Sequence, residues 1–426
     1  MSTLDVTAIK ADFPILSTTV RGGHRLVYLD SGATSQKPTV VLDAERNYYE
    51  QHNAAVHRGA HALAELATED FEAARVTIAG FVGARAKDLV FTKNATESLN
   101  LVSYAFSNAT ALNNRGAGLI DPRFVLNPGD SIVITEMEHH ANLIPWQEVC
   151  RKTGATLRWI PLTDEGRLDL THLEDLIDHT TKVVSVVHQS NILGTINPVK
   201  MLMDRAHAVG AIGIIDGCQS VPHMPVDVHH LGADLVAWSG HKMLGPTGIG
   251  CLWGTEEILE AMPPFITGGS MIQMVEMEKS TFAPPPQKFE AGTPVVAQAV
   301  ALAAGARYLE KIGMSAVADH EFELAEYTVD ALNALVGVRI IGPANAHERG
   351  SAVSFVVDGL HPHDVGQVLD SRGVAVRVGH HCAWPTCRRF AVPSTTRISP
   401  YIYNDTSDID EAIDGIVAAQ EFFGVK

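Results

Sequence analysis

Cysteine is scarce and irregularly spaced in this sequence. The 426 residues include five cysteines, which are Cys150, Cys218, Cys251, Cys382 and Cys387. An odd number scattered over a long chain does not make a disulfide framework. The C-x-x-C spacing of common structural zinc sites is absent as well. Most of these thiols are expected to be buried as small apolar side chains.

Long apolar runs and basic clusters are also missing. No stretch of about 18 apolar residues is present, which argues against a membrane span. The start, MSTLDVTAIKADFPIL, lacks the basic and apolar regions of a secretory signal. Lysine and arginine total 32 against 49 acidic residues, and a net charge of −17 is unsuited to nucleic acid. We therefore expect a cytoplasmic protein that binds neither membrane nor nucleic acid.

Short apolar runs that alternate with helical stretches dominate the first two thirds of the chain. Continuous apolarity is typical of strands that helices cover on both faces. The runs therefore predict an α/β fold with one mostly parallel sheet. They are DLVFT (88–92), DSIVIT (130–135), ATLRWI (155–160), KVVSVV (182–187), AIGII (211–215), DLVAW (234–238) and IGCLW (249–253).

Polar side chains follow four of these predicted strands. The segments are EMEHHAN, HQSNILGT, DGCQS and SGHKMLGPTG. Open α/β sheets bind ligands at the carboxyl ends of their strands. Four such clusters in register predict a single shared site.

The sequence changes character after the proline run at 284–286. A long helical stretch, VVAQAVALAAGARYLEKIG, is followed by helices that alternate with short strands. We expect an N-terminal segment over residues 1–28 that packs with the small domain. A large domain would cover 29–294, and a small C-terminal α/β domain would cover 295–426.

The stretch VRVGHHCAWPTC (376–387) places two histidines against Cys382. Cysteine and histidine side by side support either a metal site or a prepared nucleophile. The stretch alone does not decide between the two, so the rest of the chain has to supply the missing partner.

Lys242 and Asp216 offer such a partner. Lys242 lies just past a buried strand, and a lysine in a dry pocket can acquire a lowered pKa and react with an aldehyde. Pyridoxal phosphate carries an aldehyde and needs an acid opposite its ring nitrogen. Asp216 ends the strand 211–215 at the same edge of the sheet. Taken singly, Lys242 could be a surface lysine and Asp216 a turn residue.

A set of motifs runs nearly from end to end of the chain. It includes ADFPIL, YLDSGATSQKP, AVHRGAH, MEHHAN, SNILGT, DGCQS, SGHKMLGPTGIG, FEAGTP, VRVGHHC and TRISPYIYN. With these motifs the chain resembles the SufS-type (group II) cysteine desulfurases among the fold-type I pyridoxal-phosphate enzymes. The resemblance implies a fold-type I transferase with a mostly parallel seven-stranded sheet in its large domain.

The resemblance also implies roles for residues around the cofactor ring. Lys242 would attach the cofactor and later move protons, and Asp216 would pair with the ring nitrogen. Gln219 would hydrogen-bond the phenolic oxygen, and His139 would stack on the ring face. His140 would then have only a structural role.

The cofactor phosphate would be bound by Ala95, Thr96, Ser239 and His241, because a phosphate suits convergent donors and a helix N-terminus. Thr293 would reach the phosphate of a second subunit, which implies a homodimer. The family usually has Gly-Thr-Thr-Glu where this chain has NATE (94–97), so Ala95 offers a backbone N–H but no hydroxyl. The stretch 107–124 is longer than usual for the family, and we expect a surface insertion there.

The substrate implied by the resemblance is L-cysteine. Asn191 and Arg397 would hold its carboxylate, since arginine binds carboxylates through two parallel hydrogen bonds, and Arg377 would be a further substrate-binding residue. Cys382 would attack the substrate sulfur, leaving alanine and a persulfide on the enzyme. Arg377, His380 and His381 are placed to favour the reactive thiolate. Cys387 would only fill space.

The sulfur acceptor is suggested by LHPHDVGQVLD (360–370). Its HPHD pattern resembles that of desulfurases working with a zinc-containing SufU-type acceptor, in which His363 would take over a zinc ligand position. An ordinary helix start, with Asp364 near the positive end of the dipole, explains the same residues. We expect a SufU-type acceptor over a SufE-type one, and a role in iron–sulfur cluster assembly.

Two other functions fit part of the sequence. A selenocysteine lyase would use much the same residues. A zinc or iron–sulfur protein could use a set of histidines and cysteines, but it leaves Lys242 and Asp216 unexplained. That set is His139, His140, His380, His381, Cys382 and Cys387.

Overall fold

The computed structural model describes residues 4–116 and 120–425. A seven-stranded sheet forms the centre of its larger part, and all seven predicted strands belong to it. The strands are β4 (Leu89–Thr92), β5 (Ser131–Thr135), β6 (Thr156–Ile160), β7 (Thr181–Val187), β8 (Ile212–Asp216), β9 (Leu235–Ser239) and β10 (Gly250–Gly254). The predicted α/β fold is confirmed.

The sheet has the strand order β4-β10-β9-β8-β7-β5-β6. Strands β6, β5, β7, β8 and β9 run parallel to one another. Only β10 opposes its neighbours, pairing antiparallel with both β9 and β4. The sheet is therefore mostly parallel, and the carboxyl ends of β5, β7, β8 and β9 meet at one edge.

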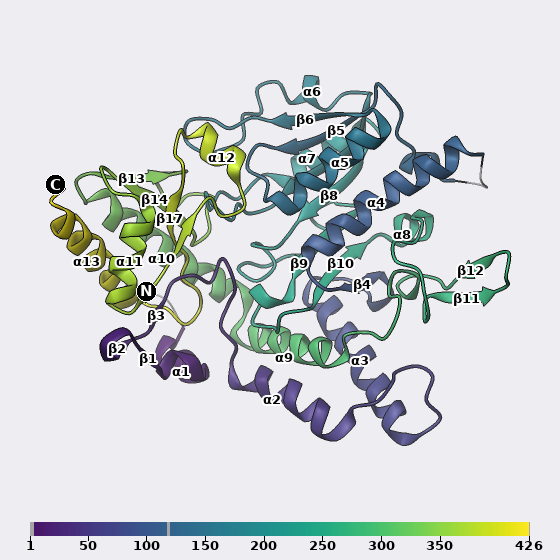
Figure 1. The fold of residues 1–426 in the computed structure, drawn as a ribbon, viewed down its shortest axis with the longest axis horizontal. Coiled ribbons are helices and arrows are strands. Elements are labelled where there is room, and N and C mark those ends of the chain that lie inside the picture. Colours follow the sequence, from purple (N-terminus) through teal and green to yellow (C-terminus); the bar gives the residue numbers. More distant parts are fainter. Residues whose placement is uncertain (1–3, 117–119, 426) are drawn as a thin grey trace.

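Helices cover both faces of this sheet, as the continuous apolar runs predict (Figure 1). One face packs against α3 (Ala62–Phe81), α7 (Val199–Ala208) and α9 (Val296–Ile312). The other face packs against α4 (Ala95–Asn114), α5 (Ile144–Thr153) and α8 (Glu256–Ala261). Successive strand residues alternate between the two cores: Val133 belongs to the first, whereas Ile132 and Ile134 belong to the second.

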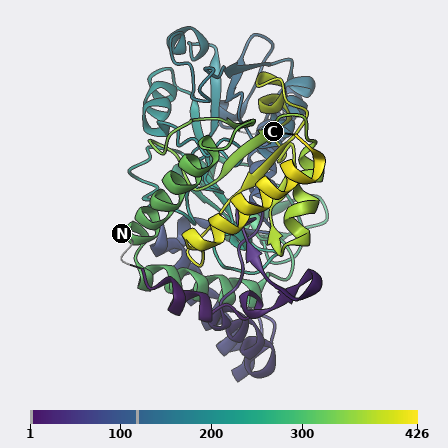
Figure 2. The same ribbon diagram turned by 90° about the vertical axis from the view of Figure 1, so that its left-hand side faces the viewer.

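A second, smaller sheet lies in the C-terminal part. Its antiparallel strands β13 (Val338–Ile341), β14 (Val353–Val357), β17 (Thr395–Ile398) and β16 (Arg377–Gly379) lie in the order β13-β14-β17-β16. The helices α10 (Met314–Asn333), α11 (Pro362–Ser371) and α13 (Thr406–Phe423) pack against it, and they stand in front in Figure 2.

The N-terminal segment contacts this C-terminal part. It contains α1 (Val6–Ala11), β1 (Thr19–Val20), β2 (His24–Arg25) and β3 (Val27–Tyr28), and β3 pairs in parallel with β15 (Val374–Ala375). Asp408 is buried and accepts from Lys10 Nζ at 2.9 Å and from Arg25 Nη1 at 2.6 Å. The predicted divisions after residues 28 and 294 stay predictions.

The remaining elements connect these layers. They are α2 (Thr39–Asn47), α6 (Leu173–Leu176), α12 (Trp384–Arg389) and a hairpin of β11 (Ile272–Val275) and β12 (Ser280–Phe282). Of the expected insertion 107–124, residues 107–114 continue α4, and 117–119 lie outside the described residues. Within the described residues, no helix is long and apolar enough to cross a membrane.

Candidate active site

A cavity lies at the carboxyl edge of the parallel strands. Its lining includes His139 after β5, Asn191 after β7, Asp216 at the end of β8, and Ser239 and Lys242 at and just past the end of β9. Each of the four polar clusters that follow the strands contributes to it. The four clusters therefore meet at one cavity, and their binding role stays a prediction.

Lys242 lies in the short turn η7 (Gly240–Lys242) that follows β9. Burial lowers the pKa of its amine below the usual lysine value, and Arg397 and Arg377 lower it further, whereas Asp216 acts in the opposite direction. Oδ1 of Asp216 accepts the backbone N–H of Cys218 at 3.0 Å, which fixes the carboxylate at the cavity wall. An amine that gives up its proton readily is suited to attack on a carbonyl carbon.

The N-terminus of α4 forms another wall of the cavity. Asn94 caps the helix, its Oδ1 accepting the N–H of Glu97 at 3.0 Å. Strand β10 passes close behind, and a Cβ at Gly250 would lie 2.4 Å from the Asn94 Cα, so only glycine fits there. The backbone N–H of Ala95 donates to Ser239 Oγ at 2.9 Å. The amide expected to reach a phosphate is thus already bonded to Ser239.

The sequence-predicted phosphate residues Thr96, Ser239 and His241 line the cavity together with Ala95. They lie where the positive end of the helix dipole of α4 favours an anion. Burial lowers the pKa of His241 to about 4, and the charges of Lys242 and Lys37 act in the same direction. An anion bound here would offset the repulsion between the positive charges of Lys242, Lys37 and a protonated His241.

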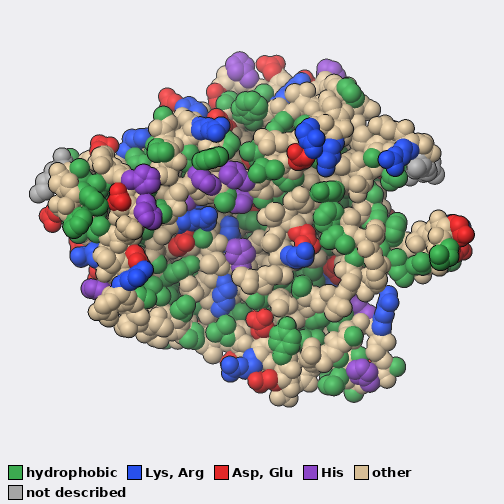
Figure 3. Space-filling view, in the orientation of Figure 1, with side chains coloured by type: hydrophobic (Ala, Val, Ile, Leu, Met, Phe, Trp, Pro, Cys, Tyr) green, Lys and Arg blue, Asp and Glu red, His purple; other side chains and the backbone are tan. Residues whose placement is uncertain are grey.

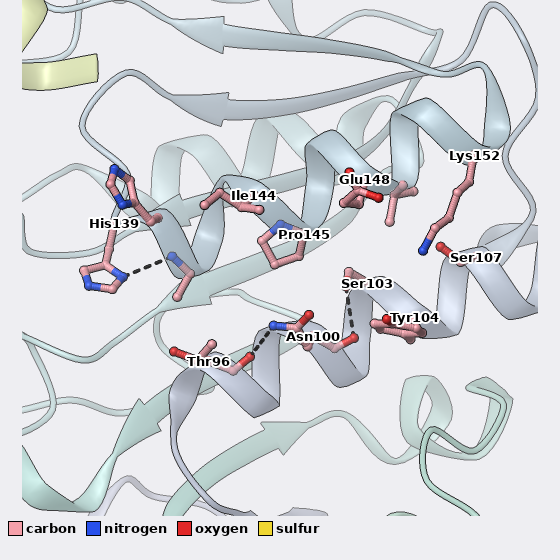
Figure 4. A pocket seen from close by; sticks show the side chains of 13 residues that line it. Thr96, Asn100, Ser103, Tyr104, Ser107, His139, Ile144, Pro145, Glu148 and Lys152 are labelled. Carbon is pink, nitrogen blue, oxygen red and sulfur yellow. Dashed lines mark hydrogen bonds between the residues drawn. The ribbon is translucent and has the colours of Figure 1, made fainter. Parts of the chain in front are cut away.

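His139 lies between the cavity and a neighbouring groove. Its Nδ1 accepts the N–H of Ala141 at 3.1 Å, and burial lowers its pKa to about 3, so the ring is neutral. The groove runs between α4 and α5, and Figure 4 shows His139 and Thr96 at one end of it and Lys152 at the other. The face of a neutral ring at this position is suited to stacking on a flat ligand.

Arg397, on β17, is fully buried behind the cavity. Its Nη1 donates to the backbone oxygen of Asn191 at 2.8 Å and its Nη2 to Asp30 Oδ1 at 3.0 Å. A Cβ at Gly32 would lie 3.0 Å from the Arg397 guanidinium, so glycine makes room for it. Burial raises the pKa of Asp30, although the Arg397 charge opposes this. Asp30 was missed as a site residue, although it lies in the YLDSGAT motif.

Asn191 contacts both Arg397 and the loop that carries Cys382. Its Nδ2 donates to the backbone oxygen of His381 at 2.6 Å. Its Oδ1 is buried without a partner among the described residues. An unpartnered amide oxygen at a cavity wall is a binding position that a ligand donor would satisfy.

Cys382 lines the same cavity, in the loop 380–383 between β16 and α12. Nη2 of Arg377 lies 3.8 Å from its Sγ, and a cation at this position favours a thiolate. The two histidines expected to help have other contacts. His380 Nδ1 accepts the backbone N–H of Cys382 at 3.2 Å. His381 is buried, which lowers its pKa to about 2, and its Nε2 lies 2.8 Å from Thr395 Oγ1.

Several predicted residues are not part of the cavity lining: Arg397, His380 and His381 lie behind or beside it, and Thr293, His363 and Cys387 lie apart from it. Thr293 is exposed on the surface. His363 is exposed in the first turn of α11, where its N–H donates to His361 Nδ1 at 3.2 Å. Cys387 is 1% exposed, and burial raises its pKa to about 11, as expected of a space-filling thiol. Across residues 4–116 and 120–425, no three His, Cys, Asp or Glu side chains are grouped to hold a metal ion.

The chain matches the family model of class-V aminotransferases over residues 27–412. It belongs to the aminotransferase class-V family. Within this family it is 57% identical over 424 residues to a probable cysteine desulfurase 2 of Mycobacterium leprae, covering 100% of this chain and 99% of that protein. It is 54% identical over 422 residues to a probable cysteine desulfurase of Streptomyces coelicolor, covering 99% and 98% of the two chains.

Solved structures of similar proteins agree with the fold. An apo cysteine desulfurase from Thermococcus onnurineus NA1 superimposes with a TM-score of 0.90 at 37% identity, and 100% of each chain is covered. The cysteine desulfurase CsdA from Escherichia coli gives a TM-score of 0.87 at 34% identity, with 99% of each chain covered. The predicted family and the fold-type I architecture are confirmed.

Proposed function

We propose that this class-V protein is a pyridoxal-phosphate-dependent cysteine desulfurase. It removes sulfur from L-cysteine, leaving L-alanine and a persulfide on Cys382. The observation that carries the proposal is the position of Cys382 in the same cavity as Lys242 and Asp216. The full-length similarity to proteins named as cysteine desulfurases supports it.

The residues present fit the cofactor. Lys242 has the lowered pKa that attachment to an aldehyde needs, and Asp216 offers the acid for the ring nitrogen. His139 offers a neutral ring face, and Gln219 lines the cavity where the phenolic oxygen would lie. The anion position at the α4 N-terminus suits the phosphate. When bound, the cofactor withdraws electrons from the amino acid attached to it and so weakens the bonds at its Cα and Cβ.

Substrate binding is assigned to Arg397 and Asn191. The Arg397 guanidinium is buried, and its charge would orient the substrate carboxylate. The Nδ2 of Asn191 has a second hydrogen beyond the one given to His381, and it would be the neutral donor beside the guanidinium. The Lys242 amine, once it is free of the cofactor, takes the proton from the substrate Cα and returns one to the product.

Cys382 performs the sulfur transfer. Its thiolate, favoured by Arg377, attacks the substrate sulfur. The Cβ–S bond of the substrate breaks, the S–S bond of the persulfide forms, and Cβ gains the hydrogen that completes alanine. The overall change converts L-cysteine and the Cys382 thiol into L-alanine and the Cys382 persulfide, with no external oxidant or reductant.

The working unit proposed is a homodimer. Thr293 is exposed in the single chain and would complete the phosphate site of the other subunit. The hairpin β11–β12 precedes it and carries the exposed apolar residues Met274, Val275 and Met277, with exposures of 47%, 62% and 98%. Figure 1 shows this hairpin projecting from the body of the protein. Apolar side chains on such a projection favour contact with a second copy.

The persulfide would pass to an acceptor protein for iron–sulfur cluster assembly in the cytoplasm. We favour a SufU-type acceptor over a SufE-type one because His363 is exposed and faces no burial cost as a metal ligand. Incubation with L-cysteine, assaying alanine and the Cys382 persulfide together, tests the proposed function. Parallel incubation with L-selenocysteine separates it from a selenocysteine lyase. A yellow colour lost on borohydride treatment separates it from a zinc or iron–sulfur protein.

A further inference from the structure

The loop that carries Cys382 has an unusual backbone. His381 and Cys382 both have positive φ angles, 51° and 58°. Residues other than glycine adopt this region rarely, and they stay there only where neighbouring contacts hold them. The contacts that hold the loop therefore decide where the Cys382 Sγ lies.

Two residues from the large sheet's loops hold this loop, the buried Asn191 and the half-buried His140. Asn191 Nδ2 donates to the His381 backbone oxygen at 2.6 Å. The backbone N–H of His140 donates to the Cys382 backbone oxygen at 2.7 Å. The His140 side chain adds a second bond, because its Nε2 accepts the backbone N–H of Trp384 at 3.1 Å.

The bond to Trp384 replaces a missing helix cap. Helix α12 begins at Trp384, and its N-cap residue is Ala383, which has no side-chain acceptor. The first N–H groups of a helix have no partner inside that helix. His140 supplies such a partner from the loop after β5. Because its Nε2 accepts, the imidazole is neutral and carries its proton on Nδ1.

Contacts between aromatic rings connect His140 to other residues of the loop. The rings of His140 and His380 lie 5.6 Å apart at 33°, and those of His380 and Trp384 lie 5.1 Å apart. His380 in turn accepts the N–H of Cys382. Histidine side chains gather near the centre of the face shown in Figure 3. A displaced His140 ring would therefore disturb His380, Trp384 and the backbone of Cys382 together.

We propose that His140 is a positioning residue for Cys382. Its imidazole clamps residues 382–384 and holds the thiol against the cavity. The two histidines of EMEHHAN then have separate tasks, His139 at the cavity wall and His140 at the nucleophile loop. The inference rests on the proposed function, since it concerns the residue that accepts the sulfur. It goes beyond the general structural role expected of His140 from the sequence.

Two substitutions separate the Nε2 acceptor from the rest of the ring. His140→Gln puts an amide oxygen near the Nε2 position, so it can still accept from Trp384. His140→Asn is equally neutral, but its oxygen reaches only as far as Nδ1. The exposed His172, which directly precedes α6, provides His172→Asn as a matched control.

The holoenzyme of each variant is mixed with L-cysteine in a single turnover, and the Cys382 persulfide is followed by mass spectrometry. We expect His140→Asn to slow persulfide formation about tenfold, as loss of a hydrogen bond that fixes the nucleophile requires. His140→Gln should stay within about threefold of the parent, and His172→Asn should match it. The cofactor absorbance and the KM for L-cysteine should not change. Parental rates in His140→Asn, or equal defects in the Asn and Gln variants, would overturn the inference.

Alkylation of Cys382 by iodoacetamide tests the same inference without the desulfurase reaction. A loosened loop should make Cys382 react several-fold faster in His140→Asn than in the parent, with His140→Gln close to the parent. If the parent forms neither alanine nor persulfide, the proposed function fails, and the alkylation rates still decide the role of His140. Equal alkylation rates in all variants would contradict the clamp.

Discussion

Replacing Arg397 by lysine keeps the charge but removes the two-pronged geometry on which the site depends. The Arg397 side chain is fully buried, and its two terminal nitrogens bond to different groups, Asn191 O at 2.8 Å and Asp30 Oδ1 at 3.0 Å. A single ammonium at this depth cannot satisfy both. One hydrogen bond involving a charged group contributes roughly 1.5–3 kcal/mol. We expect Arg397→Lys to lower the free energy of unfolding by about 2 kcal/mol.

Loss of the guanidinium should also remove a hydrogen bond to the substrate carboxylate and so weaken substrate binding. A loss of roughly 1.5–3 kcal/mol corresponds to a rise in KM for L-cysteine of about 10- to 150-fold. Arg397→Ala should cost about 3 kcal/mol of stability, because it leaves the partly buried Asp30 carboxylate without its cation. Burial already raises the pKa of Asp30 with the cation present, so Asp30→Asn in the Arg397→Ala background should recover part of that stability.

The assay is urea unfolding of the apo chain together with steady-state kinetics of the holoenzyme. Arg151→Lys is a matched control, since the Arg151 side chain is 70% exposed. Its KM and stability should equal those of the parent. If Arg397→Lys had the parental KM, Arg397 would not bind the substrate. If Arg397→Ala had the parental stability, the ion pair with Asp30 would have no energetic role.

Four further outcomes follow from the structure. Lys242→Ala should abolish alanine formation and leave no borohydride-reducible link to the cofactor; a reducible link in this variant would refute the role of Lys242. Cys387→Ser should stay largely active, because the thiol is buried at 1% exposure, whereas inactivity would require a second catalytic thiol. His363→Ala should keep basal alanine formation and lose most stimulation by a SufU-type acceptor; equal stimulation would favour a SufE-type acceptor. Burial lowers the pKa of His139 to about 3 and of His188 to about 4 from 6.5. Below pH 6.5 the unfolded chain therefore binds protons at these histidines that the folded chain does not bind. The free energy of unfolding should fall by about 1–2 kcal/mol per histidine between pH 7 and pH 5. A constant free energy of unfolding in urea over that range would contradict this prediction.

The sheet and the edge that carries the site were predictable because their signals are local. Each strand is a continuous apolar run, and the residue that ends it, such as Asp216, lies next to that run in the sequence. Parallel pairing then brings the strand ends together whatever the details of packing. This is why the sequence could predict that His139, Asp216 and Lys242 lie at one cavity.

Contacts between distant segments were not predictable in the same way. Asp30 and Arg397 are 367 positions apart, and no periodicity links them. His381 was expected to favour the thiolate, but burial keeps it neutral, and burial is a property of the packed chain. The bond from the Ala95 N–H to Ser239 likewise depends on how α4 meets β9.

The central claim is that Cys382 accepts the sulfur of L-cysteine, and a single-turnover mass measurement tests it most directly. The holoenzyme is incubated with L-cysteine, quenched and digested, and alanine is quantified in the same sample. The account predicts one added sulfur atom on the peptide that carries Cys382, in a yield equal to that of alanine, and neither product with Cys382→Ser. Alanine formed without sulfur on Cys382, or formed equally by Cys382→Ser, would contradict the account.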